Sequence, residues 1–174
     1  MKITAFGATN NKNSINKKLA LYAAQQVDNA EINLLDINDF EMPIYSEDRE
    51  NEYGIYKLAR VFFEEITNAD LVVISFAEHN GTYTSAYKNL FDWTSRVDRK
   101  VFQGKPVLLL ATSPGAGGAQ RVLDVASSSA PHFAADVIGA ISLENFYDNF
   151  DQDNGIVTKK EFNQALENAY KALN

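Results

Sequence analysis

The stretch ADLVVISFAEHNGTYTSAYKNLFDWTSR, residues 69–96, carries the clearest structural signal in the chain. It opens with an apolar run from Leu71 to Phe76 in which only Ser75 is polar. A run that is apolar on both faces is typical of a strand covered on both sides, as in a parallel sheet. The run breaks into the polar residues 78–81 (EHNG), and after Thr84 the apolar spacing becomes helical. We therefore expect a βα unit, with a polar loop at the carboxyl end of the strand, where open α/β sheets bind their ligands.

Strand and helix patterns alternate on both sides of this unit. Further strands are expected over residues 3–6, 31–36, 107–111 and 134–142. Helices are expected over residues 15–27, 54–67 and 119–128 and from a capping-box pattern at residues 158–161 onward, with loops at 40–52 and 145–155. This alternation predicts an α/β, flavodoxin-like three-layer sandwich, with a five-stranded parallel sheet of order 2-1-3-4-5 and helices on both faces. Since no linker or repeat divides the chain, we expect one domain over residues 1–174.

Composition excludes several classes of function. The 174-residue chain has no cysteine, which rules out disulfides and thiolate chemistry, and its net charge of −7 argues against a nucleic-acid partner. No apolar run approaches the roughly 20 residues that span a bilayer, and the first residues lack the apolar core of a signal peptide. The acidic residues 148–153 do not fit the calcium-loop register. We expect a cytoplasmic protein without a membrane, nucleic-acid or metal partner.

Three unusual loops follow the first, third and fourth strands, so they are expected to meet at one edge of the sheet. The first loop, GATNNKNSIN at residues 7–16, offers hydroxyls, amides and a helix N-terminus. It fits either a phosphate cradle or an ordinary loop with Asn13 or Ser14 as helix cap. The second loop, residues 77–83, and the third, TSPGAGG at residues 112–118, each fit a simple turn when taken alone. Their convergence is the main indication of a ligand site.

These segments, with the helix pattern after the second loop, resemble the signature motifs of the NAD(P)H-dependent FMN reductase family, which includes quinone, azo and chromate reductases. The family motifs are GSxRxxSxN, PEYNxSxxxxLKNxxDWxSR and KPVxxxxxSxGxxGG. The segments here are GATNNKNSIN, AEHNGTYTSAYKNLFDWTSR and KPVLLLATSPGAGG. The first loop is one residue longer than the motif and has no arginine, and the third is one residue shorter. In the second loop Ala77 replaces proline and His79 replaces tyrosine.

The resemblance implies a set of FMN-binding residues and no catalytic side chain, because the flavin carries the chemistry. The phosphate would be held by residues of the first loop, Thr9, Asn11, Ser14, Ile15 and Asn16. The ribityl chain and ring would be lined by residues of the second loop, Glu78, His79, Asn80 and Gly81. The ring would be flanked from the other side by residues of the third loop, Ser113, Gly115, Gly117 and Gly118. The resemblance also implies a dimer or tetramer formed through the helix from Thr84 to Arg96.

The expected function is an FMN-dependent oxidoreductase. It would take hydride from NADPH or NADH and pass electrons, by a ping-pong scheme, to a small acceptor such as free flavin or a quinone. One alternative is a flavodoxin-type electron carrier that does not oxidise NAD(P)H, and another is a flavodoxin fold without a cofactor. On the central helix, Asp92 and Arg96 are four residues apart, so they can pair on the surface. The resemblance implies a position near a subunit interface, which favours an intersubunit role for the two residues.

Overall fold

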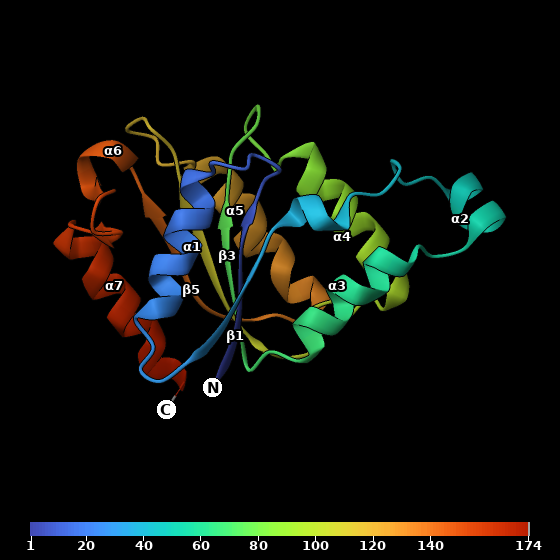
Figure 1. Ribbon diagram of the computed structural model, residues 1–174, viewed down its shortest axis with the longest axis horizontal. Helices are drawn as coiled ribbons and strands as arrows, with labels where there is room; N and C mark the ends of the chain where they lie inside the picture. The colour runs from blue at the N-terminus through green and yellow to red at the C-terminus, as the bar shows by residue number, and fades with distance from the viewer. Residues whose placement is uncertain (174) are drawn as a thin grey trace.

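A five-stranded parallel sheet runs through the middle of the computed structural model, which describes residues 1–173 (Figure 1). Its strands, in chain order, are β1 (Lys2–Ala8), β2 (Glu31–Leu35), β3 (Leu71–Phe76), β4 (Pro106–Thr112) and β5 (Asp136–Leu143). Their spatial order is β2-β1-β3-β4-β5, which confirms the predicted 2-1-3-4-5 topology. All six residues of β3 are buried, because this central strand has a strand on each side and helices over both faces.

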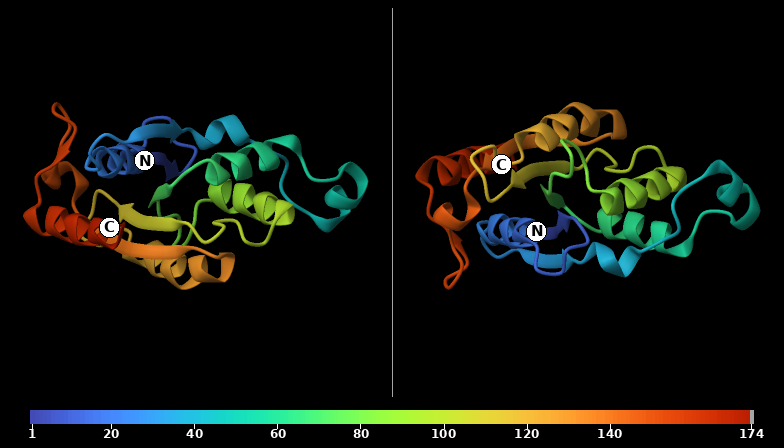
Figure 2. Two further views of the ribbon diagram at one scale, coloured as in Figure 1. Left: turned by 90° about the horizontal axis from the view of Figure 1, so that it is seen from below. Right: turned by 90° about the horizontal axis from the view of Figure 1, so that it is seen from above.

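Helices cover both faces of the sheet (Figure 2). One face is covered by α1 (Ile15–Gln25) and α7 (Lys160–Tyr170), and the other by α3 (Lys57–Thr67), α4 (Ser85–Val97) and α5 (Gln120–Ser129). Each face has its own apolar core, and Phe62 and Trp93 are among the large side chains of the second. None of the helices within residues 1–173 is both long and apolar enough to cross a membrane.

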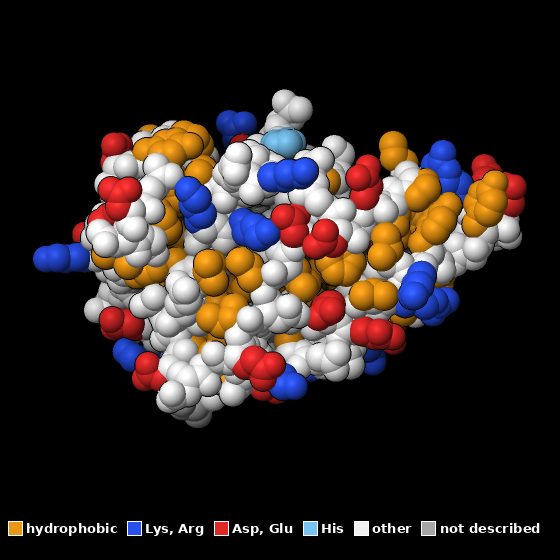
Figure 3. Space-filling model, viewed as in Figure 1, with side chains coloured by type: hydrophobic (Ala, Val, Ile, Leu, Met, Phe, Trp, Pro, Cys, Tyr) orange, Lys and Arg blue, Asp and Glu red, His pale blue; other side chains and the backbone are white. Residues whose placement is uncertain are grey.

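The connection from β2 to α3 is more ordered than the loop expected over residues 40–52. It contains the 3₁₀-helix η1 (Ile37–Phe40) and the helix α2 (Glu47–Tyr53), which extends away from the body of the protein (Figure 1). We call residues 44–53, which include α2, the arm. No residue of α2 is buried, and exposed side chains such as Ile44 and Tyr53 give the arm an apolar surface (Figure 3). The following helix starts at Lys57 rather than Gly54, because Gly54 ends α2 with a φ of 72°, which no α-helix allows.

Polar side chains of α4 hold this connection in place. The Asn89 carboxamide accepts a hydrogen bond from the Tyr45 amide at 2.8 Å and donates to the Met42 carbonyl at 2.9 Å. The Trp93 indole donates to the Pro43 carbonyl at 2.7 Å. Two residues of the KNLFDWTSR segment therefore secure a stretch more than 40 positions earlier in the chain.

Asp92 and Arg96 do not pair with each other within residues 1–173, so the surface pair that their spacing allows is wrong, while the intersubunit role stays a prediction. Asp92 instead accepts both of its contacts from Lys88, at 2.7 and 2.8 Å, while Arg96 reaches across to Glu50 on α2. Both pairs stay on the surface, where isolated ion pairs contribute about 0–1 kcal/mol. Arg96 could pair with Asp92 on its own helix or with Glu50 on α2, and the spacing of residues along one helix cannot distinguish these two acceptors.

The C-terminal region differs from the sequence expectation in two respects. The loop expected over residues 145–155 holds the short helix α6 (Phe146–Asn149) and a two-stranded hairpin of β6 (Phe150–Asp151) and β7 (Ile156–Val157). The predicted capping box does not form. The Thr158 amide is used in a bond to the Asn149 carbonyl, and α7 starts after Lys159 without a side-chain cap. With α2 and α6, the described residues form seven α-helices instead of the five patterns expected.

Candidate functional site

The three loops singled out in the sequence leave the sheet together. In the register of the sheet, Ala8 pairs with Phe76 and Phe76 pairs with Ala111, so β1, β3 and β4 end at one level. A cleft of about 490 Å³ opens above these strand ends. It is lined by Thr9, Asn10, Asn11, Asn13, Ser14, Ile15, Asn16, Ala77, Glu78, His79, Thr112, Ser113, Pro114 and Tyr147.

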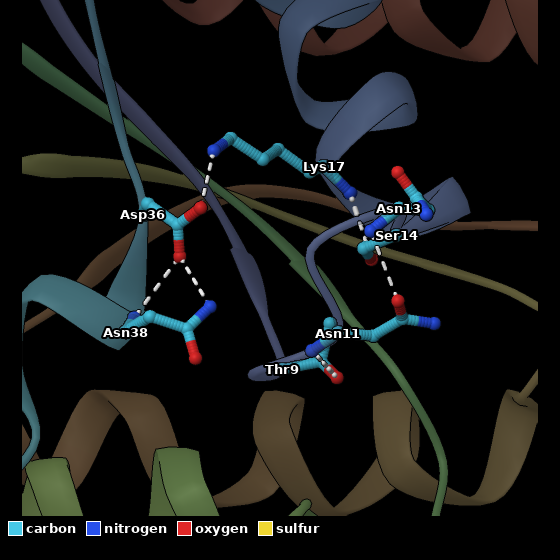
Figure 4. Close-up of polar contacts among 7 residues, drawn as sticks. All are labelled: Thr9, Asn11, Asn13, Ser14, Lys17, Asp36 and Asn38. Atoms are coloured by element: carbon cyan, nitrogen blue, oxygen red, sulfur yellow. Dashed lines mark hydrogen bonds and ion pairs between the residues drawn. The ribbon is translucent and has the colours of Figure 1, made fainter.

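The first loop leads into the N-terminus of α1, and Ser14 is the cap. Its Oγ accepts hydrogen bonds from the amides of Asn16 and Lys17 at 3.1 and 3.2 Å. Asn11 Oδ1 accepts from the Asn13 amide at 2.9 Å, which closes the turn before the helix (Figure 4). A capping hydroxyl still has its proton to donate, so the two interpretations of this loop, helix cap and phosphate cradle, are compatible in Ser14.

The Asn16 side chain lies beneath the cleft and is only 2% exposed. Its Oδ1 accepts from the Ser75 hydroxyl at 2.7 Å and from the Thr112 amide at 3.1 Å, and its Nδ2 donates to the Thr112 carbonyl at 3.2 Å. This one carboxamide joins the helix after the first loop to the strands that precede the second and third loops. Asn16 therefore positions the cleft from below.

The nearest lysine of α1 points away from the cleft. Lys17 Nζ lies 2.8 Å from Asp36 Oδ2 in an ion pair at the end of β2 (Figure 4). The Lys17 hydrogen bond, together with bonds from Asn38, holds the pKa of the Asp36 carboxyl below its usual range. Lys12, in the first loop, is exposed and forms no ion pair within residues 1–173. An anion in the cleft would meet the positive end of the α1 dipole, with Lys12 as the cationic side chain of the loop.

The second loop turns back on itself at its tip. His79 and Thr82 pair through both backbone hydrogen bonds, and Asn80 and Gly81 between them have φ values of 52° and 82°, as in a type I′ turn. The base of the loop is held by Glu78, whose Oε2 accepts from the Val122 amide at 3.2 Å at the N-terminus of α5. Glu78 and His79 line the cleft, whereas Asn80 and Gly81 form the projecting tip.

The glycines of the third loop fall into two groups. A Cβ atom at Gly115 or Gly117 would meet nothing within 4 Å, so the loop leaves open space there. A Cβ at Gly118 would lie 2.2 Å from Ser142 Oγ, whose hydroxyl donates to the Gly118 carbonyl at 2.8 Å. Gly118 is thus required for packing against β5. A second cavity of about 400 Å³ continues the cleft and shares two of its lining residues, Glu78 and Ser113.

Several residues that line the cleft are not among the predicted FMN-binding residues. They are Asn10, Asn13, Ala77, Thr112, Pro114 and Tyr147. Most are neighbours of predicted residues in the same loops. Tyr147 comes from α6, in a segment expected to be a polar loop, and is 58% exposed. Nothing in its local sequence pattern indicates that it reaches this edge of the sheet.

The sequence model described as NADPH-dependent FMN reductase matches residues 1–148 of the chain. The chain belongs to the NADPH-dependent FMN reductase family. The matched residues include all five strands of the sheet and every residue that lines the cleft. The family resemblance seen in the three loops is confirmed.

Characterised and uncharacterised relatives support this membership. A protein from Burkholderia sp. named 2-hydroxy-1,4-benzoquinone reductase is 32% identical over 120 residues, which is 68% of this chain and 63% of that protein. The quinone reductase of Escherichia coli K12 is 36% identical over 81 residues, 47% of this chain and 43% of that protein. An uncharacterised protein of Mycoplasma pneumoniae is 28% identical over 149 residues, covering 82% of this chain and 86% of its own. The aligned segments thus span less than two thirds of the two named reductases.

Solved structures show the same fold. The flavoenzyme FerB from Paracoccus denitrificans, an NAD(P)H:(acceptor) oxidoreductase, superposes with a TM-score of 0.74 at 24% identity, over 98% of this chain and 93% of that one. The azoreductase from Bacillus anthracis strain Sterne gives a TM-score of 0.63 at 17% identity, over 99% and 98% of the two chains. These likenesses confirm the flavodoxin-like architecture.

Proposed function

We propose that this member of the NADPH-dependent FMN reductase family binds FMN in the cleft, oxidises NADPH or NADH, and reduces a small acceptor such as a quinone or free flavin. The cleft itself is the main support for the proposal, because the N-terminus of α1 and two further loops meet there at the carboxyl edge of the sheet. The family model matches all the residues that line this cleft. Relatives named as quinone and FMN reductases support the choice of acceptor class.

The first loop fits a phosphate group. The donors at the loop are the hydroxyls of Thr9 and Ser14 and the amides at the start of α1. Neither the Ser14 amide nor the Ile15 amide donates a hydrogen bond within residues 1–173. The helix dipole and Lys12 supply positive character, in place of the arginine that the family motif carries. Asn11 shapes the turn, and Asn16 holds the whole loop to the sheet.

The other two loops fit the flat part of a flavin. Gly115 and Gly117 leave room for a ring beside Ser113, while Glu78 and His79 form the facing wall. Asn80, Gly81 and Gly118 act indirectly, the first two by forming the turn that ends the wall and the third by seating the loop on β5. When bound, FMN supplies the hydride and electron chemistry, so no side chain of the chain is assigned as a catalytic acid or base.

If NAD(P)H and the acceptor use the same cleft, the reaction follows a ping-pong scheme, in which the oxidised nucleotide leaves before the acceptor enters. We test the proposal with the purified chain and FMN under anaerobic conditions, adding NADPH and then NADH while recording the flavin absorbance. Bleaching by either nucleotide, followed by recovery on addition of benzoquinone, supports the reductase. Parallel double-reciprocal plots in steady state would support the ping-pong order, and intersecting plots would refute it.

A flavodoxin-type carrier is the second candidate, favoured by the net charge of −7. A carrier would bind FMN but would show no bleaching with either nucleotide in the absence of a partner protein. No flavin binding at all would refute both. Riboflavin, which lacks the phosphate, serves as the control ligand for the first loop.

The assembly expected from the family resemblance is a dimer or tetramer formed through α4. The outward side chains of this helix include Lys88 and Arg96, each of which has an ion-pair partner within its own chain. We therefore expect apolar contacts, and not these charges, to support association. Sedimentation equilibrium of the wild-type chain and of Lys88→Ala tests this, with equal association constants as the expected result.

A further inference from the structure

A third cavity lies between α4 and α5, beside the second loop, and opens to the surface where the Lys88 and Asp92 side chains line it. Its volume is about 140 Å³, and six of its lining residues are aromatic: Phe76, Tyr83, Tyr87, Phe91, Phe102 and Phe133. Phe76 precedes the second loop and Tyr83 follows the turn at its tip, so the cavity and the cleft share this loop as a partition. The proposed FMN chemistry does not use these aromatic residues.

Tyr87 is the exceptional group in this cavity. The residue is only 3% exposed, and no hydrogen bond to its hydroxyl occurs within residues 1–173. Its ring is held by Phe6, Phe76, Tyr83 and Phe91, with centroids 5.1 to 6.3 Å away, so the hydroxyl cannot swing to another partner. The Tyr87 hydroxyl is thus a hydrogen-bond donor without an acceptor among residues 1–173.

The hydroxyl opens into the cavity. Among the described residues, every side-chain oxygen that is fully inaccessible has a hydrogen-bond partner. The Tyr87 oxygen has no partner, so it must retain some accessible surface. Tyr87 lines this cavity, so we assign that accessible surface to the cavity. Burial raises the pKa of Tyr87 well above its ordinary value. The Tyr87 hydroxyl therefore keeps its proton at neutral pH and can donate a hydrogen bond. Burial also raises the pKa of the neighbouring Tyr83.

We propose that this cavity binds a one-ring aromatic carbonyl compound, with its ring between the aromatic walls and its oxygen accepting a hydrogen bond from Tyr87. The size fits, since an apolar cavity of about 150 Å³ holds one benzene molecule. The walls present both faces and edges of rings, as Phe91 and Phe133 do at 4.7 Å and 88°, which suits a planar guest. The site is separate from the FMN cleft, so its occupation does not require the proposed function.

The test uses two ligands of nearly equal shape. Acetophenone carries a carbonyl oxygen, and α-methylstyrene has a CH₂ group in its place; neither is an electron acceptor for a flavin under these conditions. Amide chemical shifts of the flavin-free chain are followed during titration with each. We expect acetophenone to shift the amides of Tyr83, Tyr87 and Ala126 saturably and more tightly than α-methylstyrene, while the amides of Thr9 and Ser14 in the cleft stay unchanged.

Variants then separate the hydroxyl from the cavity. Tyr87→Phe should weaken acetophenone binding about three- to tenfold, the effect of one neutral hydrogen bond, and leave α-methylstyrene binding as it was. Ala126→Leu, which adds side-chain volume at a lining position, should abolish binding of both ligands. Tyr53→Phe removes a hydroxyl from the exposed arm and is the matched control, with wild-type affinity for both.

Three results would overturn the proposal. The first is no saturable shift with acetophenone in a wild-type chain whose amide spectrum is that of a folded protein. The second is equal affinity of Tyr87→Phe and wild type for acetophenone, which would remove the assigned donor. The third is shifts in the amides of Thr9 and Ser14 in place of those around the cavity, which would assign the ligand to the FMN cleft.

Discussion

The Ser75 hydroxyl donates a hydrogen bond of 2.7 Å to Asn16 Oδ1, across 59 positions of the chain and in a fully buried setting. Ser75 is the one polar residue of the central strand, and its partner stands in the first turn of α1. The same Asn16 oxygen accepts from the Thr112 amide at the end of β4. The relative positions of the three cleft loops thus depend on one buried carboxamide.

Replacing Asn16 with alanine should lower the free energy of unfolding by about 2–4 kcal/mol, because it leaves the Ser75 hydroxyl and the Thr112 backbone unpaired in a buried site. Urea unfolding monitored by circular dichroism measures the change. Asn13→Ala is the control, since Asn13 is exposed and its side chain has no hydrogen bond within residues 1–173. A loss below about 0.5 kcal/mol in Asn16→Ala, the usual scatter for surface changes, would show that the network contributes little.

Replacing Ser14 with alanine should weaken FMN binding about 10- to 100-fold, because a hydrogen bond to a charged phosphate contributes about 1.5–3 kcal/mol. Riboflavin affinity should hardly change, since riboflavin has no phosphate. Quenching of flavin fluorescence on binding gives both constants. Ser46→Ala is the matched control, because Ser46 caps α2 in the same way and lies outside the cleft. An equal loss for FMN and riboflavin would place the phosphate elsewhere.

Replacing Asn89 with alanine should free the connection between β2 and α3, because its carboxamide holds the backbone at Met42 and Tyr45. We expect a destabilisation of about 1–3 kcal/mol and faster limited proteolysis in the exposed arm around α2. Mass spectrometry of the first fragments identifies the cleavage sites. Lys88→Ala, next to it on the surface of α4, should digest at the wild-type rate, and the same rate in Asn89→Ala would contradict the assigned role.

Acid should destabilise the wild-type chain more than an Asp36→Asn variant. The pKa of Asp36 is lowered in the folded state, chiefly by its hydrogen bond with Lys17, so the folded state binds this proton less readily than the unfolded chain does. The resulting stabilisation is present above the ordinary carboxyl pKa of about 4 and is lost as the pH falls through the lower folded value. Urea unfolding at a series of pH values from neutral into this range measures the difference.

Asp39→Asn provides the comparison for the acid experiment. Asp39 is exposed in the neighbouring 3₁₀-helix and has no ion pair in the described part of the chain. Its variant should follow the wild-type acid profile. Parallel profiles for wild type and Asp36→Asn would mean that the Lys17 pair does not contribute to stability.

Strand prediction succeeded where the pattern was local. The run from Leu71 to Phe76 matches β3 residue for residue, since a strand buried on both faces must be apolar throughout. Helix ends were less certain. α3 begins at Lys57 because Gly54 adopts a positive φ at the end of another helix, and α7 lacks its capping box because the Thr158 amide is used by the hairpin that precedes it.

In the candidate site, residue proximity was predictable and residue roles were not. The alternation of strands and helices, together with three loops at the ends of β1, β3 and β4, was enough to bring Thr9, Ser14, Glu78 and Ser113 to one cleft. That Gly118 packs on Ser142 while Gly117 faces open space depends on the distance between a loop and another strand. The tip position of Asn80 and Gly81 depends likewise on how the turn closes.

The amino-acid pattern was sufficient for the sheet order, the layers and the edge at which the loops converge, because apolar periodicity and the handedness of parallel crossovers are properties of local sequence and chain geometry. The partners of Asn16, Asn89, Arg96 and Glu78 required the folded chain. Each of these side chains bonds to a group more than 40 positions away, and a polar group chooses among distant partners by distance and burial, which exist only after the helices have packed on the sheet.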